Sequence, residues 1–331
     1  MTQNSITDIP GILVGQAQDD KALTGCTVVL CKNGAVGGVD QRGGAPGTRE
    51  TDALRPMHLV NKIHAIVLAG GSAFGLDAST GVMYFLEENK VGFDTGVAKV
   101  PIVASAVIFD LGVGNPKVRP DAAMGYQACL NAKSSRPLEG NYGAGIGATV
   151  GKILGMNYAT KSGIGTASME IGTGLIVGAI TVVNAFGDVF DPEENQIIAG
   201  ATNPVRSKSE GTKKNHFPGT LSLMRSIVGR TSFNMATRQN TVIGVVATNA
   251  KLSKEEINKV AQMAQNGIAK TIQPAHTMLD GDTIFALATG MKKADVSVIG
   301  AFAAEVVAKS IISAIKSSSA INKLLSYKEL H

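Results

Sequence analysis

The chain has 331 residues, of which 44% are hydrophobic and 17% charged, and this composition predicts a globular protein and excludes a disordered one. The three cysteines, Cys26, Cys31 and Cys129, are odd in number and form no C-x-x-C pair, so neither a disulfide framework nor a metal site is predicted. The N-terminus resembles no secretory signal, and no run of about 18 apolar residues occurs, so we expect a cytoplasmic protein without a membrane span.

The formal net charge of +5 comes from one stretch, residues 203–240, and not from the chain as a whole. The basic residues of this stretch face a single acid, Glu210; they are Arg206, Lys208, Lys213, Lys214, Arg225, Arg230 and Arg238. A charge run in a polar segment is typical of a solvated loop. Few aromatic residues accompany these charges and no nucleic-acid module is recognisable, so no nucleic-acid partner is expected.

The first half of the chain predicts two strands, a glycine-rich turn and a helix. Residues 25–30 (GCTVVL) and 63–68 (IHAIVL) are continuous runs of aliphatic and β-branched residues, as expected of buried strands. The second run continues into a turn over residues 70–77 (GGSAFGLD) and a helical pattern over 78–88.

The glycine-rich turn holds the first candidate binding residues, Gly70, Gly71 and Ser72. Helix N–H groups that follow such a turn can bind phosphate. The turn, however, matches neither the dinucleotide-binding pattern GxGxxG nor the phosphate-binding loop GxxxxGK(S/T) of nucleoside triphosphatases. We therefore favour a tight turn that lines a pocket over a nucleotide site.

The middle of the chain continues to alternate. We predict a strand over residues 100–109 (VPIVASAVIF), a helix over 121–132 and a strand over 174–184 (GLIVGAITVVN). Between the last two lies the most glycine-dense stretch of the chain, residues 140–152 (GNYGAGIGATVGK).

Periodicity fades over residues 203–240, where a mobile basic loop is expected, and then sharpens. Four elements follow: a strand over 241–248 (TVIGVVAT), an amphipathic helix over 253–269, a strand over 283–288 (TIFALA) and an apolar helix over 296–315. Because the alternation has no regular βαβ rhythm, a mixed α/β or α+β layered fold is predicted.

Two polar residues end the glycine-dense stretch and the strand after it. Lys152 is either a solvated charge or, in a glycine-lined pocket, a lysine of lowered pKa that stabilises an oxyanion. Asn184 stands at a strand end, where an amide can donate to an oxyanion, although most asparagines there make turns.

Asp280 and Asp282 flank Gly281. On an extended backbone, positions i and i+2 point to one face, so both carboxylates can orient and charge one catalytic group. A bare DGD is also common in turns, and no glutamate follows at the EF-hand spacing. His276 comes just before the pair, but no Ser-His-Asp triad is evident and we favour a structural role for it.

The junction between Asn240 and Thr241 is the feature of the sequence that most strongly indicates catalysis. A polar loop stops abruptly at a β-branched strand that begins with Thr. An N-terminal Thr can use its own α-amine as the base for its hydroxyl, which would account for the missing histidine. A loop-to-strand junction with Thr is otherwise ordinary.

At these residues the chain resembles the L-aminopeptidase/D-esterases and 6-aminohexanoate-oligomer hydrolases of the DmpA/NylC type. Each matching segment is weak alone, but together they occur in the family's order from about residue 10 to 310: GGSAFGLDASTGVM, PIVASAVIFDLG, GAGIGATVGK, VVNAFGDV, QNTVIGVVATN and PAHTMLDGDTIFALATG.

The resemblance implies an α+β fold: a four-layer αββα sandwich like that of N-terminal-nucleophile hydrolases, in one domain over residues 1–331. It implies self-cleavage between Asn240 and Thr241 into an α subunit of residues 1–240 and a β subunit of residues 241–331. The αβ units are expected to form homotetramers, and no metal or organic cofactor is implied.

The resemblance also assigns roles by position. Thr241 is the nucleophile, Lys152 and Asn184 line the site with Asn184 as oxyanion donor, and Asp280 and Asp282 bind the nucleophilic Thr and its amine. The segments that contain Gly70, Gly71, Ser72 and Tyr142 shape the substrate cleft.

Two features divide the family. Phe109 stands where the nylon-oligomer enzymes place a Tyr, so a hydroxyl is missing. The aminopeptidase/esterase branch tends to use Ser as nucleophile, so Thr241 and the two aspartates are more similar to the nylon-oligomer branch. The resemblance therefore implies the chemistry more closely than the substrate, which is a small peptide, an amide or an ester.

The function expected is that of a self-processing amide hydrolase, either an aminopeptidase or a hydrolase of 6-aminohexanoate oligomers. Three alternatives stay open: a Thr-nucleophile acyltransferase of the ornithine acetyltransferase kind, a non-catalytic binding protein of the same fold, and a nucleotide-binding protein that uses GGSAFGLD.

Overall fold

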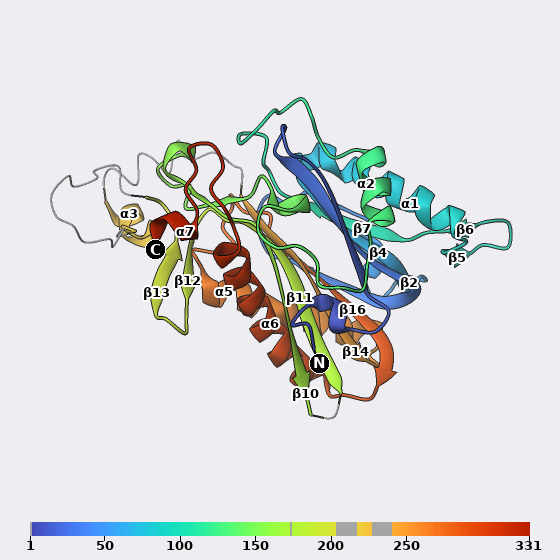
Figure 1. Cartoon of the computed structure of the whole chain (residues 1–331). Coiled ribbons are helices and arrows are strands. Elements are labelled where there is room, and N and C mark those ends of the chain that lie inside the picture. Colours follow the sequence, from blue (N-terminus) through green and yellow to red (C-terminus); the bar gives the residue numbers. More distant parts are fainter. Residues whose placement is uncertain (1, 173, 203–216, 227–239) are drawn as a thin grey trace.

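The structure is a computed structural model that describes residues 2–172, 174–202, 217–226 and 240–331 (Figure 1). Its largest sheet has nine strands in the order β10-β11-β14-β16-β2-β4-β7-β3, and β1 pairs with β2 beside this path. Their bounds are β1 Leu13–Asp19, β2 Thr24–Gln41, β3 Thr48–Arg49, β4 Lys62–Ala69, β7 Val103–Val107, β10 Ile164–Ile171, β11 Leu175–Asn184, β14 Thr241–Ala250 and β16 Thr283–Lys292.

The long strand β2 carries the sheet from one half of the molecule to the other. Its first part, Cys26 to Leu30, pairs antiparallel with β4, and its second part, Val36 to Gln41, pairs antiparallel with β16. One continuous sheet is thereby divided into a β1-β2-β4-β7-β3 half and a β10-β11-β14-β16-β2 half.

Side-chain alternation along β14 shows how the two halves stack. Val242 and Val246 belong to a core shared with α5 (Lys254–Thr271) and α6 (Val296–Lys316), whereas Ile243 and Val245 face a core shared with β4. Successive side chains of a strand point to opposite faces, so β14 is buried on both sides.

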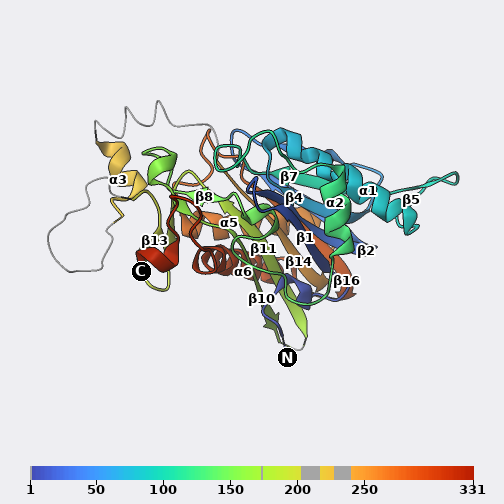
Figure 2. The same ribbon diagram turned by 45° about the horizontal axis from the view of Figure 1, so that its top comes forward.

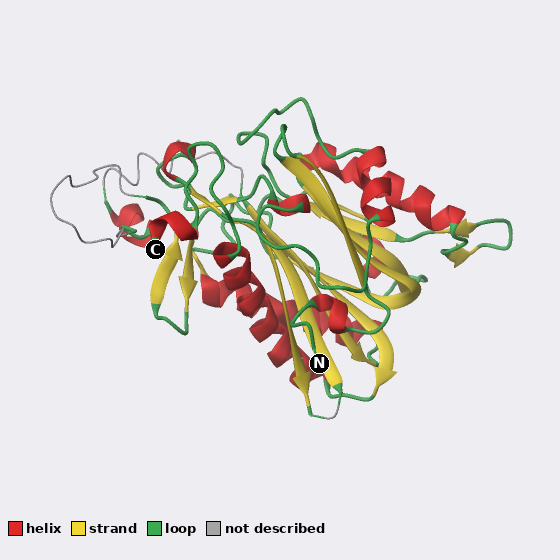
Figure 3. Cartoon of the chain, viewed as in Figure 1, coloured by secondary structure: helices red, strands yellow, loops and turns green. Residues whose placement is uncertain are grey.

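A third core closes the other side. Val28, Ala65 and Val67 pack there with α1 (Ala78–Glu88) and α2 (Ala122–Leu130). The order is therefore helices, sheet, sheet, helices, and Figures 1, 2 and 3 show α1 and α2 on one side of the strands and α5 and α6 on the other. The four-layer αββα sandwich expected from the resemblance is confirmed.

Helix α6 is long and apolar enough to cross a membrane by length and composition, but 61% of its apolar window is buried inside the molecule. It packs on α5, β10 and β11 as a core helix.

Smaller elements surround these layers. The remaining strands are β5 Phe93–Asp94, β6 Lys99–Val100, β8 Thr149–Val150, β9 Thr160–Lys161, β12 Asp188–Asp191, β13 Gln196–Ala199 and β15 Ile272–Gln273, and the remaining α-helices of the described residues are α3 Thr220–Arg225 and α7 Tyr327–Leu330. In the part of the chain that the structure describes, five short 3-10 helices occur: η1 Ile6–Asp8, η2 Asp52–Leu54, η3 Ser72–Asp77, η4 Gly143–Gly145 and η5 Met156–Tyr158.

Most predicted elements are present, with several differences. The strand predicted over residues 100–109 is split into β6 and β7, because Pro101 between them has no N–H for a sheet. Strands β1, β10, β12 and β13 were not predicted, and β2 extends well beyond the predicted residues 25–30. The predicted basic loop lies largely outside the described residues, and its described part, residues 217–226, contains the helix α3.

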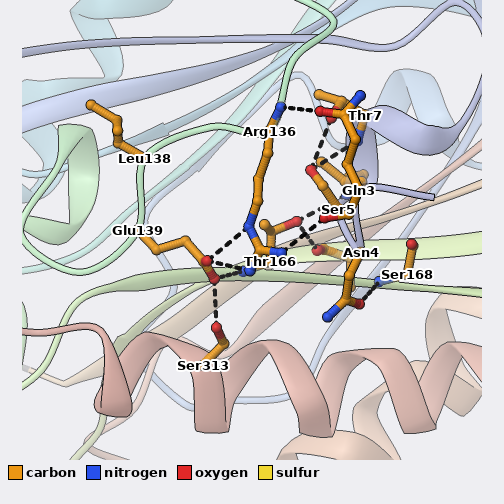
Figure 4. Close-up of polar contacts among 12 residues, drawn as sticks. Gln3, Asn4, Ser5, Thr7, Arg136, Leu138, Glu139, Thr166, Ser168 and Ser313 are labelled. Carbon is orange, nitrogen blue, oxygen red and sulfur yellow. Dashed lines mark hydrogen bonds and ion pairs between the residues drawn. The ribbon is translucent and has the colours of Figure 1, made fainter. Parts of the chain in front are cut away.

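A polar network holds the N-terminal segment onto β10 and α6 (Figure 4). The backbone N–H of Arg136 donates to Gln3 Oε1 at 2.7 Å, and Arg136 Nε donates to Glu139 at 3.1 Å. Glu139 Oε1 in turn accepts the Thr166 N–H at 2.9 Å and the Ser313 hydroxyl at 2.6 Å. Because Ser313 lies in α6, Glu139 links segments far apart in the sequence.

Candidate active site

Thr241 is the first residue of β14 and lies beside Asn184, the last residue of β11, in the antiparallel register of these strands. It is 5% exposed. Its hydroxyl donates a hydrogen bond to the carbonyl oxygen of Asn240, the residue before it. The predicted nucleophile is thus in contact with the carbonyl group of the bond that was predicted to break.

The same carbonyl oxygen of Asn240 accepts a second hydrogen bond, from the backbone N–H of Gly281 at 3.0 Å. This contact belongs to a parallel bridge between Asn240 and Asp280. A Cβ at position 281 would come 2.9 Å from the Thr241 hydroxyl oxygen and 2.7 Å from the Ala45 carbonyl oxygen, so only glycine fits without displacement.

Asp282 is bound through both carboxylate oxygens. Oδ1 accepts the N–H of Val242, the residue after the nucleophile, at 2.7 Å. Oδ2 accepts the backbone N–H of His276 at 3.0 Å and faces its ring Nδ1 at 2.9 Å. The carboxylate is 1% exposed, so it is held entirely by protein donors.

Asp280 has different partners. Its Oδ2 accepts the N–H and the hydroxyl of Thr277, at 2.9 and 2.5 Å, and its Oδ1 accepts the Phe186 N–H at 3.4 Å. Burial, and then the neighbouring carboxylate of Asp282, raise the pKa of Asp280 to about 6.

Lys152 and Asn184 contact each other directly. Lys152 Nζ donates to the side-chain oxygen of Asn184 at 2.7 Å and to its backbone oxygen at 2.9 Å. Burial lowers the pKa of Lys152 to about 7, against the opposing pull of Asp280 and Asp110. An amine of this pKa exchanges protons readily at neutral pH.

Two further bonds of the Asn184 amide fix its orientation. Its oxygen also accepts the Thr149 N–H at 3.1 Å, and one N–H of its nitrogen is directed to the Phe109 carbonyl oxygen at 3.2 Å. The glycine-dense stretch therefore supplies both Lys152 and the donor that orients Asn184.

The glycine-rich turn connects to this centre through Asp110. The Gly71 N–H donates to Asp110 Oδ1 and the Thr24 hydroxyl to Oδ2, each at 2.7 Å. A Cβ at Gly70 would come 2.0 Å from Asp110 Oδ2, so glycine is required there. Ser72 is bound to the same segment, by a 3.0 Å bond from its N–H to the Ile108 carbonyl. Burial raises the pKa of the Asp110 carboxyl.

The structure thus brings together six predicted residues at one centre: Thr241, Asn240, Asp280, Asp282, Lys152 and Asn184. The Phe109 carbonyl is bonded to this centre, and Gly70, Gly71 and Ser72 contact its neighbours Asp110 and Ile108. Tyr142 is the exception. It is 41% exposed, and within the described residues no hydrogen bond joins its side chain to Thr241 or the two aspartates.

The sequence interpretation missed two contributors, Gly281 and Thr277, and gave His276 only a structural role. All three lie within the segment PAHTMLDGD. The signal that could have found them is local: a donor side chain shortly before an acidic pair is well placed to fold back on it.

Comparisons with known proteins identify the family of the chain. The model of peptidase family S58 matches residues 4–325. An uncharacterized aminopeptidase of Mycobacterium leprae is 43% identical over 311 residues, which cover 88% of this chain and 80% of the relative. A 6-aminohexanoate-oligomer endohydrolase of a Kocuria species is 32% identical over 325 residues, covering 93% and 85% of the two chains.

Among solved structures, the L-aminopeptidase D-Ala-esterase/amidase of Ochrobactrum anthropi superposes with a TM-score of 0.71 at 17% identity and covers 99% of this chain and 92% of that one. A Burkholderia β-aminopeptidase gives a TM-score of 0.68 at 20% identity, with the same coverage of both chains. The first is described as a variant of the N-terminal-nucleophile hydrolase fold.

The family model and the named relatives define a hydrolase of amide bonds, and the solved structures show that it is built on a sandwich of the N-terminal-nucleophile hydrolase type. With a family match over residues 4–325 and relatives above 30% identity, the chain belongs to peptidase family S58.

Proposed function

We propose that the chain cleaves itself between Asn240 and Thr241 and then hydrolyses amide bonds with Thr241 as its N-terminal nucleophile. The observation that carries this proposal is the hydrogen bond from the Thr241 hydroxyl to the Asn240 carbonyl oxygen, which also accepts the Gly281 N–H. A nucleophile and an oxyanion donor thus converge on one peptide group.

In the precursor, Thr241 Oγ attacks the Asn240 carbonyl carbon. The C–N bond to Thr241 breaks, the hydroxyl proton passes to the leaving nitrogen, and an ester and a free α-amine result. Water then hydrolyses the ester, which leaves Asn240 as a new C-terminus. The Gly281 N–H stabilises the negative charge on the carbonyl oxygen during attack.

In the mature enzyme the new α-amine of Thr241 takes the proton from Oγ, since an α-amino group of pKa about 7.7–8.0 suits a general base near neutral pH. Oγ attacks the substrate carbonyl, the amine product leaves with the proton, and water hydrolyses the acyl-enzyme. Asn184 and Gly281 serve as oxyanion donors, and Lys152 stabilises negative charge beside Asn184.

The substrate class we propose is a short peptide or a linear oligomer of ω-amino acids. Relatives named aminopeptidase and 6-aminohexanoate-oligomer endohydrolase support it. Both classes of substrate are joined by amide bonds and differ in the number of carbon atoms between the nitrogen and the carbonyl group of each unit. We also propose, on the resemblance alone, that the αβ units assemble as a homotetramer.

Intact mass under denaturing conditions tests the first step. We expect wild type to give two fragments, of residues 1–240 and 241–331, and Thr241→Ala to give one uncut chain. Thr241→Ser is the matched control and should still be cut, because it keeps a hydroxyl. A wild-type chain that stays whole after long incubation at neutral pH would contradict the proposal.

Release of amine from aminoacyl anilides and from 6-aminohexanoate dimers and trimers tests the second step. Cleaved wild type should hydrolyse one of these sets, and uncut Thr241→Ala neither. Transfer of the acyl group to an added amine in preference to water would instead indicate an acyltransferase.

A further inference from the structure

The ring of His276 lies against the site without touching the nucleophile. Its Nδ1 is 2.9 Å from Asp282 Oδ2, and its own backbone N–H donates to the same oxygen at 3.0 Å. A residue that binds one carboxylate oxygen twice, through ring and backbone, fixes the plane and the position of that carboxylate.

The backbone of His276 is adapted to this double contact. Its φ is +57°, in the left-handed region that few residues other than glycine adopt. This conformation directs the N–H and the ring toward the same oxygen. Backbone strain of this kind persists where surrounding contacts hold it, and at His276 the contacts that the structure shows are those to Asp282.

Asp282 Oδ1 receives the Val242 N–H at 2.7 Å. Val242 follows Thr241 directly, so rotation of this carboxylate would release the start of β14 and shift the nucleophile. With Oδ2 held by His276, the carboxylate cannot rotate without losing two hydrogen bonds at once.

The remaining ring nitrogen takes no part in this arrangement. Nε2 is buried and makes no hydrogen bond with any described residue. The ring therefore serves Asp282 through Nδ1, where the hydrogen must lie because a carboxylate oxygen only accepts.

We propose that His276 is a positioning residue for the reaction: it holds Asp282 so that the carboxylate keeps the start of β14, and with it Thr241, in place for attack. This assignment rests on the proposed function, because it gives Asp282 a task that only a nucleophilic Thr241 requires. The neighbouring pair of Thr277 and Asp280 is a parallel case, but among the described residues the Asp280 carboxylate is bound by Thr277 and Phe186 and not by β14.

Two variants separate positioning from bulk packing. His276→Asn places an amide N–H near the position of Nδ1 and tolerates the left-handed backbone, whereas His276→Leu keeps side-chain volume and removes the donor. Exposed His58→Leu is the control for loss of a histidine elsewhere.

The first measurement is hydrogen exchange in the Thr241→Ala chain, which needs no activity. We expect the Val242 amide to exchange roughly 10-fold or more faster in His276→Leu, relative to the Gly244 amide of the same strand, since one hydrogen bond to a charged acceptor is weakened. His276→Asn and His58→Leu should leave this ratio unchanged. An unchanged ratio in His276→Leu, or equal acceleration at both amides, would overturn the proposal.

The second measurement uses the chain with Thr241. We expect His276→Leu to slow self-cleavage and to lower kcat by roughly 10–100-fold at nearly constant KM, as is found when a residue that orients a metal ligand is replaced. His276→Asn should restore most of the cleavage rate and of kcat. Leu and Asn variants equally active would refute a positioning role. If wild type itself is not cleaved, the proposed function fails, while the exchange ratio still decides whether His276 anchors Asp282.

Discussion

Asp280 and Asp282 are two residues apart, yet their surroundings differ. Asp282 is bound by N–H groups of His276 and Val242, whereas Asp280 takes a Thr277 hydroxyl and has its pKa raised to about 6 by burial and by Asp282. Environments that differ in this way divide the roles of two carboxyl groups. With its pKa raised to about 6, Asp280 changes its charge just below neutral pH.

The sign of this shift gives a stability prediction. A raised pKa means that the folded state binds more protons than the unfolded state between the ordinary value of 3.8 and about 6, so Asp280 lowers stability as pH rises through that window. We expect Asp280→Asn, in the uncut Thr241→Ala background, to gain stability relative to its parent between pH 4 and pH 7. Urea unfolding of both proteins at several pH values measures this difference.

Because both proteins contain the other buried carboxyl groups, such as Asp110 and Asp188, their contributions to the pH dependence of the unfolding free energy cancel in the comparison. Burial raises the pKa of these two groups as well. A difference in unfolding free energy that stays constant with pH, or that falls as pH rises, would show that Asp280 does not titrate in this window.

Asn184 carries the second residue-scale prediction. Because its amide is the proposed oxyanion donor, Asn184→Ala should reduce kcat roughly 10²–10³-fold and slow self-cleavage. Asn249→Ala is the matched control: Asn249 is also buried and bonded to backbone, at the other end of β14. Steady-state rates of both variants, corrected for the cleaved fraction, should differ; equal rates would remove Asn184 from the chemistry.

The residues of the centre could be predicted from the sequence, but their contacts could not. Thr241, Lys152, Asn184, Asp280 and Asp282 stand at ends of predicted elements. The hydrogen bonds of His276, Thr277 and Gly281 depend on a loop whose backbone folds back on itself. The spacing of hydrophobic residues in the sequence does not predict such a loop conformation. Tyr142 was placed in the cleft by resemblance, and no described bond brings it to Thr241.

The elements of the fold followed their periodicity where it was strong. The capping box at Ser253 and Glu256 begins α5 as its spacing indicates, and Asp121 caps α2. Strand β10 was not predicted because its second half, Ser168 to Ile171, is only partly buried and because the strand includes small and polar residues. The length of β2 was underestimated since glycines such as Gly37 and Gly38 interrupt its apolar run.

The contact between α5 and α6 gives a prediction at this scale. A Cβ on Gly267 of α5 would come 2.4 Å from the Ala304 carbonyl oxygen and 2.8 Å from Val307 Cβ in α6. Gly267→Ala should therefore destabilise by about 1–3 kcal/mol, although alanine favours helices by up to about 1 kcal/mol.

Asn266→Ala is the control for this change. Asn266 is exposed on the same helix, so the substitution should stabilise by a few tenths of a kcal/mol. Thermal unfolding of both variants in the Thr241→Ala background measures the two effects. A stabilised Gly267→Ala protein would mean that the helices separate at little cost.

At the scale of the whole molecule, the proposed cut does not divide the fold into two pieces. Strands β14 and β16 follow the cut in sequence but lie between β11 and β2, which precede it. Helices α5 and α6 also follow it, and α6 is bound to Glu139 through Ser313. The sequence order alone could not show this arrangement, because it depends on which strands pair.

We therefore expect the two fragments to stay together. After complete cleavage, size-exclusion chromatography in native buffer should give one peak containing both fragments, and denaturant should be needed to separate them. Fragments that elute apart without denaturant would contradict this sheet order.

The central place of β14 and β16 also changes how the protein can refold. An uncut chain brings its own segments together at an effective concentration of about mM, whereas separated fragments at about µM must first meet, a factor on the order of 10³ or about 4 kcal/mol. The strand pairing away from the cut is expected to stay the same, whereas the unfolded state gains freedom. Cleavage would thus make the mature enzyme's recovery from unfolding depend on its concentration, while the precursor's would not.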